Sequence, residues 1–283
     1  MFTLTIERPD GERLTLTQFH SAYNVTYAGF GPVAAEVATT ALGMADGDKL
    51  TATRRGKRNP VLTVTIGGNV EANRIRLYRY LTPGHSVKLY YKNGTRDVYT
   101  EGVVEAFECN QFTAPVRAQI SIICPQPYWV NTSEIIHDMT GVINMFSFPF
   151  SVPAEGVEMS ALGANNYAMI CNDGDEAAGF VISVYARLDV VAPVIYNAVT
   201  QEAFRLQGTL YQGQTLTINT STGRKRLTIT DASGNVANVL HRKQPGSVWL
   251  QLVPGDNYIA YSAQSGADAM AVKLIYNKLY VGV

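Results

Sequence analysis

The sequence predicts a mainly β protein with two domains, and three observations support this prediction. Apolar residues recur at every second position in many short segments, beginning with Phe2, Leu4 and Ile6. Gly, Pro, Asn and Asp separate these segments at short intervals, as turns do between antiparallel strands. Only one stretch, near residues 70–81, has the spacing of an amphipathic helix. A chain of 283 residues is also long enough for two hydrophobic cores.

The first domain is predicted over residues 1–130. Its opening hairpin turns at Pro9-Asp10-Gly11, since Asp-Gly between alternating runs is typical of a hairpin. Further strands are predicted at 23–27, 61–66, 86–91, 95–107, with a break at Gly102, and 117–124. Residues 43–60 are predicted to form a loop. Pro125 and Pro127 end the domain, because two prolines so close cannot continue a central strand.

One helix is predicted from Val70 to about Tyr80, with Asn69 as its N-cap. Pro83-Gly84 ends it, because proline lacks the amide that a helix requires. The residues expected to share its buried face are Ala72, Ile75 and Tyr78, widened by Leu77 and Leu81.

A connector is predicted over residues 131–168, with an apolar island at 146–150. The second domain, residues 169–283, is predicted to be an antiparallel β-sandwich, because its strands recur about every 10 residues. Those strands are expected at 180–188, 193–197, 202–206, 215–220, 225–230, 236–240, 248–252, 257–262 and 271–280. We expect the last one to tie the C-terminus into the sandwich.

The balance of positive and negative residues argues against binding of nucleic acid or acidic membranes through the net charge of the protein. The chain carries 23 Lys and Arg and 23 Asp and Glu, so it has no net charge with which to attract nucleic acid or acidic lipid. Cys109, Cys124 and Cys171 form no CxxC pair and are predicted to be reduced core or near-core residues, typical of folding in a reducing cytosol. The N-terminus lacks the pattern of a signal peptide, and no segment has the apolar length of a membrane span.

No catalytic or metal-binding motif is present, and we therefore expect neither enzymatic activity nor a cofactor. The four histidines are scattered, and Asp173-Gly174-Asp175-Glu176 lacks the spacing of a calcium loop, so we interpret it as a turn. Glycan hydrolysis would require two opposed carboxylates, whereas Glu101, Glu105 and Glu108 follow one another on one predicted strand. Surface ion pairing is the preferred interpretation of these three.

One basic cluster stands out, formed by Arg54, Arg55, Lys57 and Arg58. We consider it a candidate subunit or partner contact; a solvated loop or a grip on nucleic-acid phosphates are the alternatives. Trp129 and Trp249 are candidate sugar-stacking residues, but the strand context of Trp249 favours a core position.

Several short motifs, in order along nearly the whole chain, resemble one known family. They are Arg76 to Gly84, Leu89 to Arg96, Gly102-Val103-Val104-Glu105, Ile120 to Trp129, Phe148-Pro149-Phe150, Asn172-Asp173-Gly174-Asp175, Leu216 to Thr220, Trp249 to Asn257 and Tyr276 to Val283. The chain resembles the distal tail proteins of siphophages that infect Gram-positive bacteria, which form the hub of the tail baseplate.

This resemblance implies a structural protein of the virion, assembled in the host cytoplasm. Six copies would form a ring through the N-terminal domain and bind the tail-tube protein on one side and a tail-associated spike or lysin protein on the other. The C-terminal domain would be a galectin-like sandwich that carries receptor-binding or side-fibre proteins, and phage DNA would pass through the ring. The alternative is a carbohydrate-binding module for host cell-wall glycans. The sugar-binding His-Asn-Arg set of galectins is missing, however, and His241-Arg242 is its nearest fragment.

Overall fold

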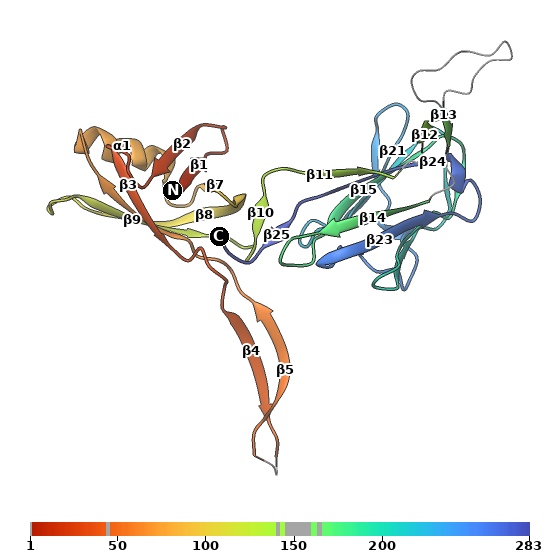
Figure 1. The fold of residues 1–283 in the computed structure, drawn as a ribbon, viewed down its shortest axis with the longest axis horizontal. Helices are drawn as coiled ribbons and strands as arrows, with labels where there is room; N and C mark the ends of the chain where they lie inside the picture. Colours follow the sequence, from red (N-terminus) through yellow and green to blue (C-terminus); the bar gives the residue numbers. More distant parts are fainter. Residues whose placement is uncertain (1, 44–45, 140–141, 145–159, 163–165) are drawn as a thin grey trace. The chain divides into compact units, whose positions relative to one another are not determined.

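The computed structural model describes residues 2–43, 46–139, 142–144, 160–162 and 166–283, and it divides into two compact units (Figure 1). Unit 1 comprises Met1–Thr132 and Leu279–Val283, and unit 2 comprises Ser133–Lys278. The chain thus passes from one unit to the other twice. The described residues form many strands and a single α-helix, which confirms the predicted mainly β fold.

Unit 1 is built on a barrel-like sheet in the order β25-β10-β8-β7-β1-β2-β3-β6-β9, with β9 pairing back onto β8. Its strands are β1 (Thr3–Glu7), β2 (Arg13–Thr17), β3 (Tyr23–Ala28), β6 (Val61–Ile66), β7 (Ser86–Lys92), β8 (Asp97–Asn110), β9 (Arg117–Ile123), β10 (Trp129–Asn131) and β25 (Leu279–Tyr280). The turn at Pro9-Asp10-Gly11 joins β1 to β2 as predicted, and Gly11 there has a φ of 85°. Neighbouring strands are antiparallel except β2 and β3.

Strand β8 closes the barrel, because different parts of it pair with different neighbours. Residues 97–103 pair with β7, and residues 103–110 pair with β9 across a β-bulge near Val104. A Cβ atom on Gly102 would lie only 2.7 Å from the Cys124 sulfur and 2.7 Å from the Ile123 carbonyl oxygen. Glycine therefore permits the close approach that closure requires. The break predicted at Gly102 is not seen, since the strand continues through it.

The helix α1 (Val70–Tyr80) begins where predicted, with the Asn69 side chain accepting a hydrogen bond from the Ala72 amide at 3.2 Å. Its predicted buried face is confirmed for Leu77 and Leu81 and wrong for Ala72 and Ile75. Ala72 and Ile75 are exposed, whereas Leu77 and, just beyond the helix, Leu81 are fully buried in the barrel core. The sheet lies against a face rotated away from the one that apolar spacing suggested.

The barrel core contains a cluster of aromatic rings beside the aliphatic residues. Tyr27 stacks on Phe30 with ring centroids 4.1 Å apart, and Phe2 meets Tyr27 edge-on at 4.8 Å. Tyr91 joins them through a hydrogen bond between its hydroxyl group and that of Tyr27 at 3.2 Å. Burial and this hydrogen bond raise the pKa of Tyr27 to about 12.

A two-stranded hairpin, β4 (Ala35–Ala41) and β5 (Asp48–Arg55), extends from the barrel between β3 and β6 (Figure 1). Its two strands pair only with each other. The prediction of a loop over 43–60 is wrong for residues 48–55. Because both faces of the hairpin are exposed, its sequence shows no alternation of buried and exposed positions that could have revealed it.

Unit 2 contains two larger antiparallel sheets, ordered β11-β24-β15-β20-β21-β22 and β14-β23-β17-β18. Their strands are β11 (Ile135–Asp138), β14 (Tyr167–Asn172), β15 (Phe180–Ala186), β17 (Val194–Asn197), β18 (Glu202–Arg205), β20 (Thr215–Asn219), β21 (Arg226–Thr230), β22 (Val236–Asn238), β23 (Gly255–Ser262) and β24 (Met270–Tyr276). Smaller elements are β12 (Val142–Asn144), β13 (Ser160–Leu162), β16 (Val190–Val191), β19 (Thr209–Leu210) and the 3₁₀ turns Leu240–Arg242 and Ala267–Ala269. The Tyr276 hydroxyl of β24 donates to the Cys171 carbonyl of β14 at 2.8 Å and joins the sheets.

The unit boundaries differ from the predicted ones in two places. Residues predicted to form one strand over 271–280 divide into β24 in unit 2 and β25, which pairs with β10 in unit 1. The C-terminus is therefore tied into the barrel and not into the sandwich. Strand β11, predicted as part of the 131–168 connector, pairs with β24. The apolar island at 146–150 lies outside the described residues.

Candidate functional site: assembly surfaces

The strands of the β4–β5 hairpin pair with each other and with no other strand of the described chain. Every residue of both strands is exposed, including Val37 at 58% and Leu50 at 61%. Internal contacts such as the Thr39 hydroxyl to the Asp48 carboxylate, at 2.9 Å, hold the ribbon together. A two-stranded ribbon is marginally stable in water on its own. Its apolar side chains are therefore available to a partner.

The predicted basic cluster lies at the base of this hairpin, and three of its four members reach the surface. Arg54 pairs with Glu36 on the facing strand at 2.7 Å. Arg55 donates to the Tyr128 hydroxyl at 3.1 Å and lies over its ring. Lys57 is exposed.

The fourth member, Arg58, is fully buried and is therefore not available at the surface for the predicted contact with a subunit or partner. Its guanidinium donates five hydrogen bonds to four backbone carbonyl oxygens, at distances of 2.6–3.1 Å. The acceptors are Gly29, Gly31, Pro127 and Val281. Burial lowers the pKa of the Arg58 guanidinium, yet arginine remains charged at neutral pH.

These four carbonyls come from three separate stretches of unit 1. Gly29 and Gly31 precede the hairpin, Pro127 precedes β10, and Val281 follows β25. Arg58 itself follows β5 and forms a two-bond backbone bridge with Cys124, both bonds being 2.9 Å long. One side chain thus holds the hairpin's base and the returning C-terminal segment to the same barrel edge.

Neither tryptophan is an open sugar platform. Trp129 is fully buried, donates its indole N–H to the Phe30 carbonyl at 3.1 Å, and packs beside Arg58. Trp249 is half-buried against Phe204, with ring centroids 5.2 Å apart. The predicted strand over 248–252 is absent, and Trp249 lies in an irregular segment.

His241-Arg242 is the fragment nearest to a galectin sugar site, and its arginine forms hydrogen bonds within its own chain. The Arg242 guanidinium donates to the Gln207 carbonyl at 3.0 Å and to the Thr209 carbonyl at 2.7 Å. The neighbouring His241 is exposed in a 3₁₀ turn. Arg242 is thus committed to backbone carbonyls of its own chain.

Buried asparagines organise the segment 249–257, which carries part of the family resemblance. Asn257 accepts a hydrogen bond from the Val253 amide at 3.0 Å and donates to the Val253 and Gly255 carbonyls. Asn172 donates to the Leu252 carbonyl at 2.9 Å, and Asn197 reaches Asn257 at 3.3 Å. All three asparagines are fully buried. Because this segment has no neighbouring strand to pair with over most of its length, the asparagine side chains supply hydrogen bonds to its buried backbone groups.

The acidic candidates serve structural contacts. Glu101 pairs with Lys88 at 3.2 Å, and Glu105 accepts a hydrogen bond from the Ser121 hydroxyl at 2.8 Å. Asp173 pairs with Lys278 at 2.5 Å. No group of three or more His, Cys, Asp or Glu within the described ranges could hold a metal ion.

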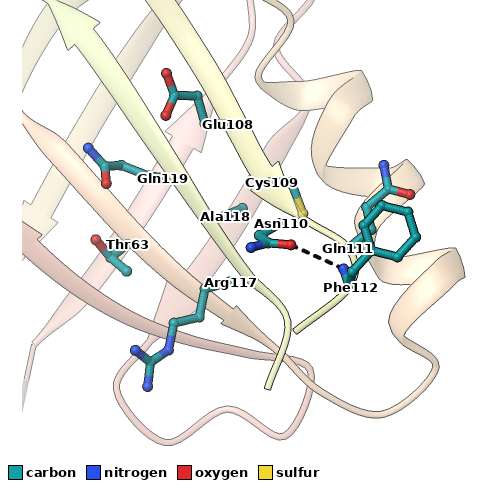
Figure 2. A pocket seen from close by; sticks show the side chains of 9 residues that line it. All are labelled: Thr63, Glu108, Cys109, Asn110, Gln111, Phe112, Arg117, Ala118 and Gln119. Carbon is teal, nitrogen blue, oxygen red and sulfur yellow. Dashed lines mark hydrogen bonds between the residues drawn. The ribbon is translucent and has the colours of Figure 1, made fainter. Parts of the chain in front are cut away.

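A shallow hollow of about 810 Å³ lies at the β8–β9 end of the barrel (Figure 2). Its lining residues are Thr63, Glu108, Cys109, Asn110, Gln111, Phe112, Arg117, Ala118 and Gln119. In the loop, the Asn110 side chain accepts a hydrogen bond from the Phe112 amide at 3.2 Å, and the Phe112 ring is 99% exposed. Glu108 is the one acidic residue of this lining and Arg117 the one basic residue.

All three cysteines carry free thiols. Cys124 is buried, which raises its pKa, and Cys109 is half-buried. Cys171 is exposed on β14, so the prediction of a core or near-core position is wrong for it. Its hydrogen bond to the Asp256 carboxylate is the main cause of its raised pKa.

Comparison with known proteins confirms the family resemblance. Residues 173–280 match the family model described as "Siphovirus-type tail component, C-terminal domain". Among curated proteins, none matches this sequence significantly. Within the described residues, no helix is both long and apolar enough to cross a membrane.

Two solved phage structures share the fold of the whole chain. One is the SPP1 Dit protein, described as a paradigm of the hub adsorption apparatus in phages that infect Gram-positive bacteria. It has 12% identity and a TM-score of 0.67, with 98% of each chain covered. The other belongs to the phage P2 baseplate in its activated conformation with Ca, with 10% identity, a TM-score of 0.55 and full coverage of both chains.

Proposed function

We propose that this protein is a structural component of a phage tail tip that forms a ring through unit 1 and joins the tail tube to the proteins of the tip. The observation that carries the proposal is the shared fold over 98% of both this chain and SPP1 Dit, together with the match of residues 173–280 to a siphovirus tail family. Six copies per ring, a tube protein on one side and a spike or lysin protein on the other follow from the family resemblance.

The hairpin supports assembly on independent physical grounds. It presents Val37 and Leu50 to solvent beside Arg54, Arg55 and Lys57 at its base. A surface that combines exposed apolar residues with a polar rim is typical of a protein interface. We therefore assign the hairpin to the contact between copies in the ring.

The mass of the purified full-length chain tests the proposal, measured by light scattering and by electron microscopy of single particles. A ring of about six copies is expected at low salt. It should weaken as salt rises, because exposed charges are screened beyond about 3 Å at 1 M ionic strength.

A charge-reversal pair, Arg54→Glu with Arg55→Glu, should lower the ring population. The matched control is Lys225→Glu with Arg226→Glu, an exposed basic pair at β21 in unit 2, which should leave the ring intact. A strict monomer at high concentration, even with the tube protein added, would contradict the proposed function. Equal effects of the two pairs would remove the hairpin from the ring contact.

A further inference from the structure

The outer faces of the two large sheets in unit 2 differ in chemistry. On the six-stranded sheet this face carries the polar residues Ser183, Thr215, Thr217, Asn219 and Lys273, together with Tyr185 and an aliphatic group of Ile136, Val181 and Ile275. On the four-stranded sheet it carries Tyr167, Met169, Tyr196, Tyr258 and Ala260, and beyond them, at the end away from Asp256, Val194, Ser262 and the exposed Arg205. We call the first five residues of this second set the tyrosine face.

The strand register brings the members of the tyrosine face together. Met169 of β14 lies directly opposite Tyr258 of β23. Ala260 lies opposite Tyr167 on one side and Tyr196 of β17 on the other. Directly paired residues have Cβ atoms about 5 Å apart, and diagonal neighbours lie about 7–8 Å apart. The side chains therefore form one continuous patch across three strands.

The patch is open to solvent. Tyr167 is 56% exposed, Met169 55% and Tyr258 43%. Large exposed apolar groups occur singly on most surfaces, but a contiguous group that includes tyrosine and methionine is typical of a protein interface.

One end of the tyrosine face is acidic. Asp256 lies opposite the exposed Cys171 at the end of β14, and Asp173 and Asp175 follow in the adjoining turn. Lys278 pairs with Asp173. The exposed Asp256 carboxylate favours a partner that places a basic side chain at this end.

We propose that the tyrosine face docks a second protein, which presents aromatic or aliphatic side chains beside at least one lysine or arginine that meets Asp256. A glycan fits less well. Sugar recognition needs converging hydrogen-bonding groups among the rings, whereas Met169 and Ala260 lie between the tyrosines here and the Tyr196 hydroxyl donates to Gln201 at 2.6 Å. The proposal goes beyond ring formation, which involves unit 1.

The test uses the full-length chain as bait for a displayed library of random short peptides. Enriched peptides should combine aromatic or aliphatic residues with lysine or arginine. Their affinity should fall about tenfold or more for the double variant Met169→Thr with Tyr258→Thr, since central apolar anchors carry most of a docking energy. Asp256→Asn should weaken binding at low salt and have little effect at high salt. Tyr185→Thr, on the outer face of the six-stranded sheet, is the matched control and should bind as the unchanged chain does.

Thermal unfolding and ring mass are measured on every variant, so a folding defect or a failure of ring formation is recognised separately. The absence of peptides whose binding depends on Met169 and Tyr258 would overturn the proposal. Binding of purified Gram-positive cell-wall polysaccharide with that same dependence would assign the face to glycans and overturn it too. Self-association that disappears in the double variant would assign the face to a second copy, with the same consequence.

Discussion

Replacement of Arg58 by methionine tests whether one buried cation organises the edge of the barrel. The change Arg58→Met keeps an apolar stem of similar length but removes all five hydrogen bonds to the carbonyls of Gly29, Gly31, Pro127 and Val281. Each bond to a charged donor contributes about 1.5–3 kcal/mol. Taking the guanidinium out of water offsets several kcal/mol of that sum.

The net loss of unfolding free energy depends mainly on the carbonyl groups left without donors, because each buried unsatisfied group costs about 1–3 kcal/mol. We expect unit 1 to lose about 3–5 kcal/mol of unfolding free energy, as when one partner of a buried charged contact is removed. Arg58→Lys should recover less than half of the loss, since one ammonium group cannot reach four carbonyls in a fixed plane.

The assay is urea unfolding combined with amide hydrogen exchange of residues 279–283, whose backbone Arg58 holds through Val281. Exchange in that segment should accelerate in the methionine variant. Lys57→Met removes the neighbouring exposed cation and serves as the control, with a change within about 0.5 kcal/mol. A loss below about 1 kcal/mol for Arg58→Met, or unchanged exchange near Val281, would refute the reasoning.

Three further predictions follow from single contacts. Tyr27 has its pKa raised to about 12, so in the folded state it keeps its proton to a higher pH than in the unfolded state. The stability of unit 1, measured by urea unfolding, should therefore fall between about pH 10 and about pH 12. The fall should be less steep in Tyr27→Phe. Gly102→Ala should destabilise unit 1 by about 1–3 kcal/mol in the same assay, because its Cβ would lie 2.7 Å from Cys124; a neutral effect would show that the barrel closure relaxes easily. Asn257→Ala should destabilise unit 2 by about 2–4 kcal/mol by calorimetry, since it leaves the Val253 amide and carbonyl without their side-chain partner, and a loss under about 0.5 kcal/mol would contradict that role.

Local signals in the sequence predicted those elements that depend on neighbouring residues. The Asp10-Gly11 turn and the Asn69 cap act within a few residues of themselves, so both could be placed without a structure. The buried face of α1 was predicted only in part, because it depends on where the sheet lies; Leu77 faces the core as expected and Ile75 does not. The β4–β5 hairpin was missed for the opposite reason, since nothing covers either face and no alternation arises.

The candidate contact residues show the same division. Lys57 and Arg58 are adjacent cations, and nothing in their local sequence distinguishes them. Only the folded chain brings four carbonyls from distant segments around Arg58 and leaves Lys57 in solvent. The tyrosine face was likewise invisible in the sequence, because its residues come from three strands that are distant along the chain.

By itself the sequence determined the mainly β class, the family resemblance, the single helix and the absence of catalytic motifs, because composition, periodicity and short motifs are properties of neighbouring residues. The tertiary structure alone decided that the last strand returns to the barrel, that Arg58 is buried, and that tyrosines gather on one sheet face. These features depend on pairing between residues far apart in the chain, where register and burial, and not local propensity, set the free energy.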